Sequence, residues 1–367
     1  MKTNTYSIIV GTGSYIPEAK VLNQDFLDRE FYGADGRRLE KSNEQIVKKF
    51  EEITETKERR YAANHLVASD IAFYTAESAL ESSGICGESL DYIIVAHNFG
   101  DVEASNRLCN CLPSLAARVK NRLRIRNPKT IVYDILFGCP GWLQGMIQAN
   151  YFLKSGDAKR ILVIGTEILS RVADFHDKDS MLYSDGAGAT ILEAVESQEP
   201  VGMLSHSIRS DTLEHAYLLR MGESFGPDHK GNGLFVKMAG HELYKYALRR
   251  VPNVVKESLD KAGLTLQDVR LILLHQANGK MDKAILDLLF GLYGTQKAPI
   301  DIMPMTISWL GNNSVATIPI MLDLLFKGKL DGFQLARGDV AVLASVGAGM
   351  NINSVVYCER NAHASYA

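Results

Sequence analysis

The sequence repeats a pattern of strands and helices, and this repeat limits the folds open to the chain more than any other feature. Three pairs of segments match each other at intervals of roughly 175 residues. The matched pairs are residues 90–97 and 269–275, 131–139 and 302–312, and 156–167 and 337–349. Because a duplicated strand–helix unit builds two related halves, we divide the chain into an N-terminal half, residues 1–200, and a C-terminal half, residues 201–367.

Apolar runs and amphipathic segments alternate within both halves, which predicts an α/β fold. Strands are expected at residues 6–10, 90–96, 131–137, 160–164, 183–192 (a turn leading into a strand), 269–274 and 340–345. Helices are expected within 43–60 (followed by a basic turn), at 69–83, in part of 106–118, and at 141–153, 240–262, 280–292 and 316–326. Such an order predicts mixed, largely parallel sheets with helices outside. A Gly-rich loop is expected at 221–234.

Three polar residues follow expected strands at matching places in the repeat. They are Cys139, His275 and Asn312. A duplication places equivalent strand ends together about a pseudo-twofold axis, and ligands of α/β sheets bind at the carboxyl ends of strands. We therefore expect these three side chains to share one pocket.

Cys139 lies between an apolar, β-branched run and a segment of helical periodicity. Gly138 precedes it and Pro140 follows it, and Pro is favoured at the first position of a helix. The positive end of a helix dipole favours thiolate over thiol, so we expect a lowered pKa and a nucleophilic sulfur. The alternative is a buried, inert thiol, which is the more common state of a free cysteine.

The composition narrows the function classes. The chain has 367 residues, a net charge of −3 and 46% hydrophobic residues, so it is typical of a globular protein and gives no sign of nucleic-acid binding. Its five cysteines lack the paired spacing of a metal site, and an odd number fits a reducing, cytoplasmic setting. No signal peptide or membrane span is expected, because no apolar run approaches ~20 residues.

Six short motifs, taken in order, resemble the β-ketoacyl-ACP synthase III family of the thiolase superfamily. They are GTGSYIP, FGCPG, YSDGAGA, LLHQANGK, LGNNS and VGAGM, and the resemblance extends from about residue 6 to residue 357. It implies a thiolase-like fold in which duplicated βαβαβ halves form α/β/α/β/α layers. It also implies a catalytic triad of Cys139, His275 and Asn312.

The resemblance implies a reaction in two halves. The Cys139 thiol takes an acyl group from a thioester, and the backbone N–H groups of Cys139 and Ala348 form the oxyanion hole. Ala348 stands where the family has Gly, between Gly347 and Gly349, which we assign to the supporting shell. A malonyl thioester is then decarboxylated, and His275 and Asn312 donate hydrogen bonds to the enolate. The β-ketoacyl product would start fatty acid biosynthesis, and no metal or redox cofactor is expected.

Several neighbouring residues receive supporting roles. Asn278 is expected to support His275. His97 is interpreted as structural or pocket-lining, and Glu167 and Asp185 as structural. Asn313 is set aside because the family pattern is Gly-Asn, which selects Asn312. A Glu-based mechanism, as in hydroxymethylglutaryl-CoA synthase, remains a minor alternative.

The chain departs from the family pattern at three places. Gln45 replaces the Trp that stacks on the CoA adenine, Lys280 replaces the usual Arg, and residues 97–121 are atypical of an acyl pocket. The loss of an aromatic platform removes about 1–3 kcal/mol of stacking. We therefore hypothesise an acyl donor carried by ACP rather than CoA, which suits a specialised ketosynthase making dialkylresorcinols or pyrones.

The expected partner is acyl carrier protein, which is acidic. The candidate docking residues are Lys245, Arg249 and Lys280, within a wider basic set that also includes Arg250, Lys256 and Lys283. The resemblance also implies a homodimer, with the strand before Cys139 near the interface. Two other functions stay open: a Cys-dependent acyltransferase that performs no decarboxylation, and a degenerate partner subunit.

Overall fold

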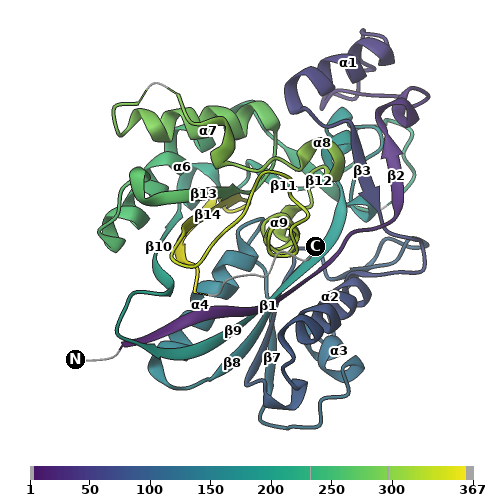
Figure 1. The fold of residues 1–367 in the computed structure, drawn as a ribbon. Helices are drawn as coiled ribbons and strands as arrows, with labels where there is room; N and C mark the ends of the chain where they lie inside the picture. Colours follow the sequence, from purple (N-terminus) through teal and green to yellow (C-terminus); the bar gives the residue numbers. More distant parts are fainter. Residues whose placement is uncertain (1–3, 232, 296, 361–367) are drawn as a thin grey trace.

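Two stacked β-sheets organise the computed structural model, which describes residues 4–231, 233–295 and 297–360 (Figure 1). The first sheet has the strand order β1-β9-β8-β4-β7 and the second the order β10-β15-β14-β13. The proposed division of the chain at residue 200 falls between the strands of the two sheets. The strands are β1 (Asn4–Tyr15), β2 (Ala19–Leu22), β3 (Glu58–Tyr61), β4 (Tyr92–Ala96), β5 (Asp101–Val102), β6 (Cys109–Asn110), β7 (Ile131–Ile135), β8 (Arg160–Ile168), β9 (Asp185–Ser197), β10 (Gly202–Ser210), β11 (Leu219–Gly222), β12 (Phe235–Met238), β13 (Val269–Leu274), β14 (Val340–Gly347) and β15 (Asn351–Cys358).

Helices form three layers around these sheets. They are α1 (Asn43–Thr54), α2 (Ala68–Ser83), α3 (Leu115–Arg122), α4 (Gly141–Ser155), α5 (Thr212–His215), α6 (Gly240–Ala262), α7 (Gly279–Gly291), α8 (Ile307–Leu310) and α9 (Thr317–Phe326). In Figure 1, α2 and α3 lie on one side of the molecule, α6 and α7 on the opposite side, and α4 and α9 between them. This arrangement confirms the expected α/β/α/β/α layers.

The burial of each layer follows from its neighbours. Every residue of α9 is buried, because this helix lies between the two sheets. Strand β4 and residues Leu271–Leu274 of β13 form continuous apolar runs, since both faces of each sheet are covered by helices. The cluster between the sheets includes Trp142 and Met321, while the outer clusters centre on Ile71 and Val255.

The sheets are mixed, as expected, but the prediction that they are largely parallel is wrong. Parallel pairing joins β4 to β7 and β8, and β13 to β14. Antiparallel pairing joins β9 to β1 and β8, and β15 to β10 and β14. The difference arises because β8–β9 and β14–β15 are connected without an intervening α-helix, as antiparallel neighbours allow.

The repeat is incomplete before Asn312, where the expected strand is absent. The segment instead forms a 3₁₀ turn at Ile300–Ile302 and the short helix α8. Consequently the second sheet has four strands where the first has five. Asn312 therefore does not follow a strand of that sheet.

Other differences are local. The helix expected within residues 106–118 begins at Leu115, after the short strand β6, and the basic turn expected near residue 60 is strand β3. Residues 223–231 and 233–234 match the predicted loop, whereas residue 232 lies outside the described residues. Strands β10 and β15 were not anticipated, because their sequences mix polar and apolar residues.

Candidate active site

Cys139 sits on a tight turn between β7 and α4, pressed against a second turn from the other half of the chain. Gly138 has a φ of +69°, and a Cβ at this position would lie 2.7 Å from the backbone nitrogen of Ala348. A Cβ at Gly347 would lie 2.5 Å from the backbone nitrogen of Cys139. Glycine at both positions is therefore needed for the two turns to meet, which brings the backbone of Ala348 beside Cys139.

The expectation that the helix dipole makes Cys139 a thiolate is wrong for the unliganded protein. Burial, together with a smaller effect of the nearby Glu167 carboxylate, raises the pKa of the Cys139 thiol to about 11. A hydrogen bond from Ser314 and a backbone N–H act in the opposite direction but do not compensate. Desolvation is the larger effect because the sulfur is removed from water, so the resting group is a thiol.

His275 follows β13 and is held as a neutral ring. Its backbone N–H donates to the carbonyl oxygen of Ala344 at 2.8 Å, and its Nδ1 lies 3.2 Å from Thr317 Oγ1. The Thr317 hydroxyl donates its proton to the carbonyl oxygen of Ser314 at 3.0 Å. We therefore assign the ring proton to Nδ1, which leaves Nε2 as the acceptor. Burial lowers the pKa of His275 to about 4, consistent with the neutral form.

Asn312 is placed by the loop that leads into β9. Its backbone N–H donates to the carbonyl of Leu182 at 3.0 Å, and it pairs with Tyr183 through an isolated parallel bridge. Its side-chain Oδ1 accepts the backbone N–H of Ser314 at 2.8 Å. Because Oδ1 is used in this way, Nδ2 is the end of the amide left to donate to a ligand.

Ser314 links the three predicted triad residues, and the sequence analysis missed it. Its Oγ donates to Cys139 Sγ at 3.4 Å, its backbone nitrogen binds Asn312, and its carbonyl oxygen accepts the Thr317 hydroxyl that contacts His275. Its φ is +51°, an uncommon value for a non-glycine residue. The LGNNS motif contained this residue, but family pattern alone directed attention to the two asparagines.

Gln276 is a second residue that sequence reasoning missed. Its Nε2 donates to the carbonyl of Pro304 at 2.7 Å, and its Oε1 accepts the backbone N–H groups of Thr306 and Ile307, both at 2.7 Å. This buried amide joins the strand that carries His275 to the segment that leads to Asn312. Its hydrogen bonds fix residues 304–307, which are not part of the second sheet.

Asn98 and Glu167 form a hydrogen-bonded extension of the site behind Ser314. Asn98 Nδ2 lies 3.3 Å from Ser314 Oγ and 2.5 Å from Glu167 Oε2. Burial raises the pKa of the Glu167 carboxyl to about 7. Glu167 was expected to be structural, and its carboxylate is connected to Cys139 through the side chains of Asn98 and Ser314.

The remaining predicted residues lie around this centre. Asn278 caps α7, with Oδ1 accepting the backbone N–H of Met281 at 3.1 Å, so its described contact supports the helix rather than His275. Asn313 is turned away and donates to the carbonyl of Asp185 at 2.8 Å. His97 is buried, with Nε2 3.0 Å from Asp134, which fits a structural role.

Asp185 is held by local structure. Its carboxylate accepts the backbone N–H and hydroxyl of Ser170 and the backbone N–H of Ala62. These contacts fix β9 against neighbouring segments, as a structural residue would. Gly349, with a φ of +127°, completes the turn around Ala348.

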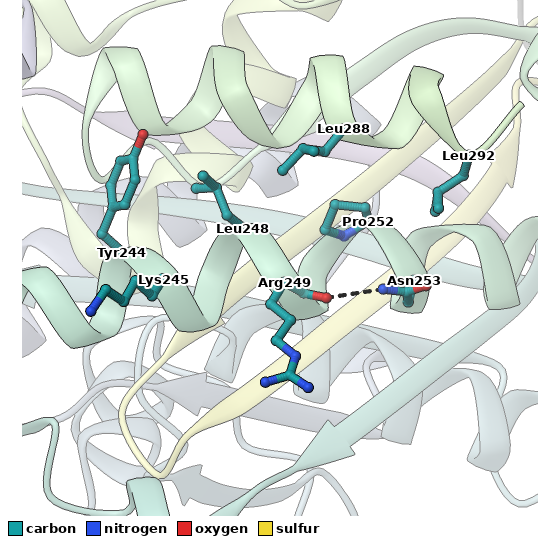
Figure 2. Close-up of a pocket in the computed structure, with 8 residues that line it drawn as sticks. All are labelled: Tyr244, Lys245, Leu248, Arg249, Pro252, Asn253, Leu288 and Leu292. Carbon is teal, nitrogen blue, oxygen red and sulfur yellow. Dashed lines mark hydrogen bonds between the residues drawn. The ribbon is translucent and has the colours of Figure 1, made fainter. Parts of the chain in front are cut away.

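The predicted docking residues lie on α6 and α7. Lys245 and Arg249 line a groove of about 450 Å³ between these helices, whereas Lys280 lies in the first turn of α7 outside the groove lining. Figure 2 shows Leu248 and Pro252 facing toward the α7 side of this groove. The other lining residues are Tyr244, Asn253, Leu288 and Leu292.

Ion pairs separate the basic residues of this surface into two groups. Arg250 lies 3.9 Å from Asp211, Lys256 2.8 Å from Asp260, and Lys283 2.7 Å from Glu55. Lys245 pairs with Glu242 at 3.3 Å, but both are exposed. Within residues 4–231, 233–295 and 297–360, Arg249 and Lys280 make no ion pair, so their charge is available to a partner.

The fold and the site together define a class of protein. Five alternating layers with a cysteine at a strand–helix turn, beside a histidine and an asparagine from the second half, are the features of a thiolase-like condensing enzyme.

The comparisons with known proteins give the family. The family model described as 3-oxoacyl-[acyl-carrier-protein] synthase III matches residues 133–212, and that of its C-terminal part matches residues 259–358. The β-ketoacyl-[acyl-carrier-protein] synthase III 1 of Halalkalibacterium halodurans is 31% identical over 93% of this chain and 95% of that protein. The chain therefore belongs to the 3-oxoacyl-[acyl-carrier-protein] synthase III family and is an acyl-transferring condensing enzyme.

Solved structures agree with this assignment. The 3-oxoacyl-[acyl-carrier-protein] synthase III of Aquifex aeolicus superposes with a TM-score of 0.75 and 29% identity, covering 96% of this chain and 99% of that one. A priming β-ketosynthase from a polyketide biosynthetic pathway has a TM-score of 0.79 at 22% identity, covering 99% of this chain and 98% of that one. The second likeness supports the fold alone.

Among the residues that the structure describes, no group of three or more His, Cys, Asp or Glu side chains is placed to hold a metal ion. In the same residues, no helix is both long and apolar enough to cross a membrane.

Cys109 and Cys111 are exposed free thiols whose sulfurs lie 3.2 Å apart.

Proposed function

We propose that this enzyme transfers an acyl group to Cys139 and then condenses it with malonyl-ACP, releasing CO₂ and a β-ketoacyl thioester that starts fatty acid biosynthesis. One observation carries this proposal: Cys139, Asn312 and the His275–Thr317 pair all contact Ser314. Side chains linked through a single residue lie close enough to act on the same thioester.

The first half-reaction is acyl transfer. Cys139 Sγ attacks the thioester carbonyl, and the thiol proton passes to His275 Nε2 and then to the departing thiolate. The neutral state of His275 supports this role, because an imidazolium could not accept the proton. The oxyanion accepts from the backbone N–H groups of Cys139 and Ala348, whose turns are in contact.

The second half-reaction is decarboxylation and carbon–carbon bond formation. Loss of CO₂ leaves an enolate, whose oxygen accepts from Asn312 Nδ2 and from His275 once the ring has taken up a proton from the solvent. The enolate carbon attacks the acyl group, and the Cys139 thiolate leaves and takes that proton. The donor orientation of Asn312 favours this reaction over acyl transfer without decarboxylation, which uses no enolate.

Gln45 supports ACP as the carrier of the acyl donor. Its Oε1 accepts the backbone N–H of Ser42 at 3.2 Å, so the side chain is folded into the N-terminal cap of α1. The two tryptophans of the chain, Trp142 and Trp309, lie elsewhere, and neither provides a platform on α1. A donor that binds through a carrier protein does not need an adenine platform, and this supports the specialised ketosynthase as the second candidate.

A loading experiment tests both the nucleophile and the carrier. Purified enzyme is incubated with matched acyl-ACP and acyl-CoA, and the acyl group on the Cys139 peptide is followed by mass spectrometry. We expect Cys139 to be acylated roughly tenfold or more faster from acyl-ACP, in keeping with the lost stacking energy. Equal rates would reject the ACP donor, and absence of any acyl-Cys139 would reject the proposed function.

The groove between α6 and α7 is the proposed docking surface for ACP. An acidic protein that presents apolar side chains would fit an apolar groove flanked by Arg249 and by Lys280 at the start of α7. The apolar lining from Leu248, Leu288 and Leu292 supports contact rather than a purely solvated helix face.

Charge reversal tests this surface. We expect the double variant Lys280→Glu and Arg249→Glu to raise the KM for malonyl-ACP roughly tenfold, because like charges then oppose the acidic partner. The KM for a small malonyl thioester should change less than about twofold. Lys329→Glu, an exposed lysine beside β1 and α2, is the control. Equal effects on both substrates would reject the docking surface.

The edge strand β7 supports a homodimer. Within the described part of the chain it pairs with β4 alone, and the exposed Ile131 and Leu136 (50% and 65% exposed) lie on it or just after it. A bare sheet edge with apolar side chains is a surface that proteins usually cover. Sedimentation of the purified protein at the mass of a single chain would contradict this proposal.

A cytoplasmic location is also proposed. Its support is the state of the cysteines: all five, Cys86, Cys109, Cys111, Cys139 and Cys358, are free thiols. The absence of a cofactor requirement remains a prediction, tested by full activity after dialysis against a chelator.

A further inference from the structure

A chain of hydrogen bonds leads from the buried carboxylate of Glu167 to the sulfur of Cys139. The Asn98 side chain is the link between them, since its Nδ2 reaches both Glu167 Oε2 at 2.5 Å and Ser314 Oγ at 3.3 Å. The backbone N–H of Asn98 lies 3.5 Å from Glu167 Oε1. Ser314 Oγ then donates to Cys139 Sγ at 3.4 Å.

The directions of these bonds follow from the chemistry of each group. An ionised carboxylate only accepts, so the amide of Asn98 must turn its NH₂ toward Glu167. That same NH₂ then donates its second proton to Ser314 Oγ. Since the oxygen of Ser314 is already an acceptor, its single hydroxyl proton is free to point at the sulfur of Cys139.

We propose that Glu167 and Asn98 are positioning residues that orient the Ser314 hydroxyl as a hydrogen-bond donor to the Cys139 thiolate during acyl transfer and product release. This inference rests on Cys139 being the nucleophile of the proposed function. Ser314 touches the reacting sulfur, whereas Asn98 and Glu167 act through it.

The need for such a donor comes from the burial of the sulfur. The thiolate appears twice, when Cys139 attacks the donor and when the product leaves, and both times the surrounding protein shields it from much of the water. Hydrogen bonds to charged groups are stronger than those between neutral groups, and more so in a buried site. A fixed hydroxyl therefore replaces part of the lost hydration.

The hydrogen-bond relay, which runs from Glu167 through Asn98 and Ser314 to Cys139, depends on the protonation state of Glu167. Burial raises its carboxyl pKa to about 7, while His97 at the end of β4 lowers it and Asp185 at the start of β9 raises it. The carboxylate in turn raises the pKa of the Cys139 thiol. Below about pH 7, a protonated Glu167 is able to donate, so Asn98 is free to turn over and accept the Ser314 hydroxyl, which then leaves the sulfur.

The pH profile of Cys139 alkylation tests the relay. Purified full-length enzyme is treated with iodoacetamide from about pH 6 to about pH 10, and peptide mass spectrometry separates Cys139 from the exposed Cys86, Cys109 and Cys111. We expect the pH dependence of the alkylation rate to move up by about one pH unit in Ser314→Ala. At a fixed pH below the thiol pKa, the reaction should therefore be roughly tenfold slower. Glu167→Gln should remove an inflection near pH 7 that the unchanged enzyme shows, because the glutamine side chain does not ionise.

Two further variants show whether an effect of Ser314→Ala comes from the lost hydroxyl or from a disturbed fold. Ser314→Gly removes the same hydroxyl at a backbone position whose positive φ glycine prefers, so it should reproduce the Ser314→Ala profile. Ser170→Ala removes a buried hydroxyl from another buried carboxylate, Asp185, and should leave the profile unchanged.

The outcomes separate the relay from the function beneath it. Profiles of Ser314→Ala and Ser314→Gly that superimpose on that of the unchanged enzyme would overturn the relay, as would an equal shift in Ser170→Ala. If Cys139 is never acylated by any thioester, the proposed function itself fails. If it is acylated and the profiles do not move, the function stands and the relay alone is rejected.

Discussion

Replacing Cys139 by alanine is expected to abolish condensation while leaving decarboxylation of malonyl-ACP. The acyl group has no other sulfur to occupy at the centre, so β-ketoacyl formation should fall by about 10⁴-fold or more, as for other removed nucleophiles. Asn312 and His275 are unchanged by this substitution, and the enolate they stabilise does not require the thiol. Release of labelled CO₂ should therefore stay within about tenfold of its original rate.

The comparison of these two rates makes the Cys139→Ala experiment informative. Loss of both reactions in a protein with an unchanged melting temperature would show that the halves of the reaction are not separable as proposed. Retention of β-ketoacyl formation would show that Cys139 is not the nucleophile. Cys358→Ala, a change at a buried thiol in β15 whose sulfur lies 3.8 Å from the carbonyl oxygen of Gly338, is the control and should keep both activities.

Replacing Asn312 by aspartate is expected to have the opposite pattern. The new carboxyl group keeps an oxygen for the backbone N–H of Ser314, so the local contact at 2.8 Å is retained. It loses the Nδ2 donor, and when ionised it places negative charge where the enolate charge develops. The lost donor alone should slow CO₂ release by about 10²–10³-fold, while acylation of Cys139 should change by less than about tenfold.

The neighbouring asparagine supplies the control for Asn312→Asp. Asn313 Nδ2 donates to the carbonyl of Asp185, and Asn313→Ala removes this buried bond. We expect it to lower the melting temperature by a few degrees, at about 1–3 kcal/mol, with CO₂ release retained by the folded protein. If instead Asn313→Ala stops CO₂ release and Asn312→Asp does not, the choice between the two asparagines is wrong.

The structure supports some sequence interpretations and corrects others for identifiable reasons. The repeat and the alternation of strands and helices led to the α/β fold, whereas the α/β/α/β/α layers came from the family resemblance. The strand expected before Asn312 is absent, because hydrogen bonds to the Gln276 amide and to Leu182 hold that segment where sheet pairing was assumed.

The ionisation of Cys139 was misjudged for a similar reason. The sequence revealed the helix that follows the cysteine, and a helix dipole acts locally. It did not reveal how far the surrounding protein shields the sulfur from water, which depends on segments far away in the chain, including the turn at Gly347. Here desolvation has a larger effect than the dipole.

The sequence by itself determined which residues form the repeat, which cysteine follows a strand and precedes a helix, and which histidine follows the matching strand in the second half. These features depend on neighbours along the chain, through periodicity, glycine at tight turns and proline at a helix start. The choice of Asn312 over Asn313 came from the family resemblance. The tertiary structure alone decided that Ser314 contacts the whole triad, that Asn98 connects it to Glu167, and that Arg249 and Lys280 keep their charge unpaired within the described residues. Hydrogen bonds and ion pairs depend on distance and direction in space, and residues more than 200 positions apart, such as Asn98 and Ser314, carry no mark of them in sequence.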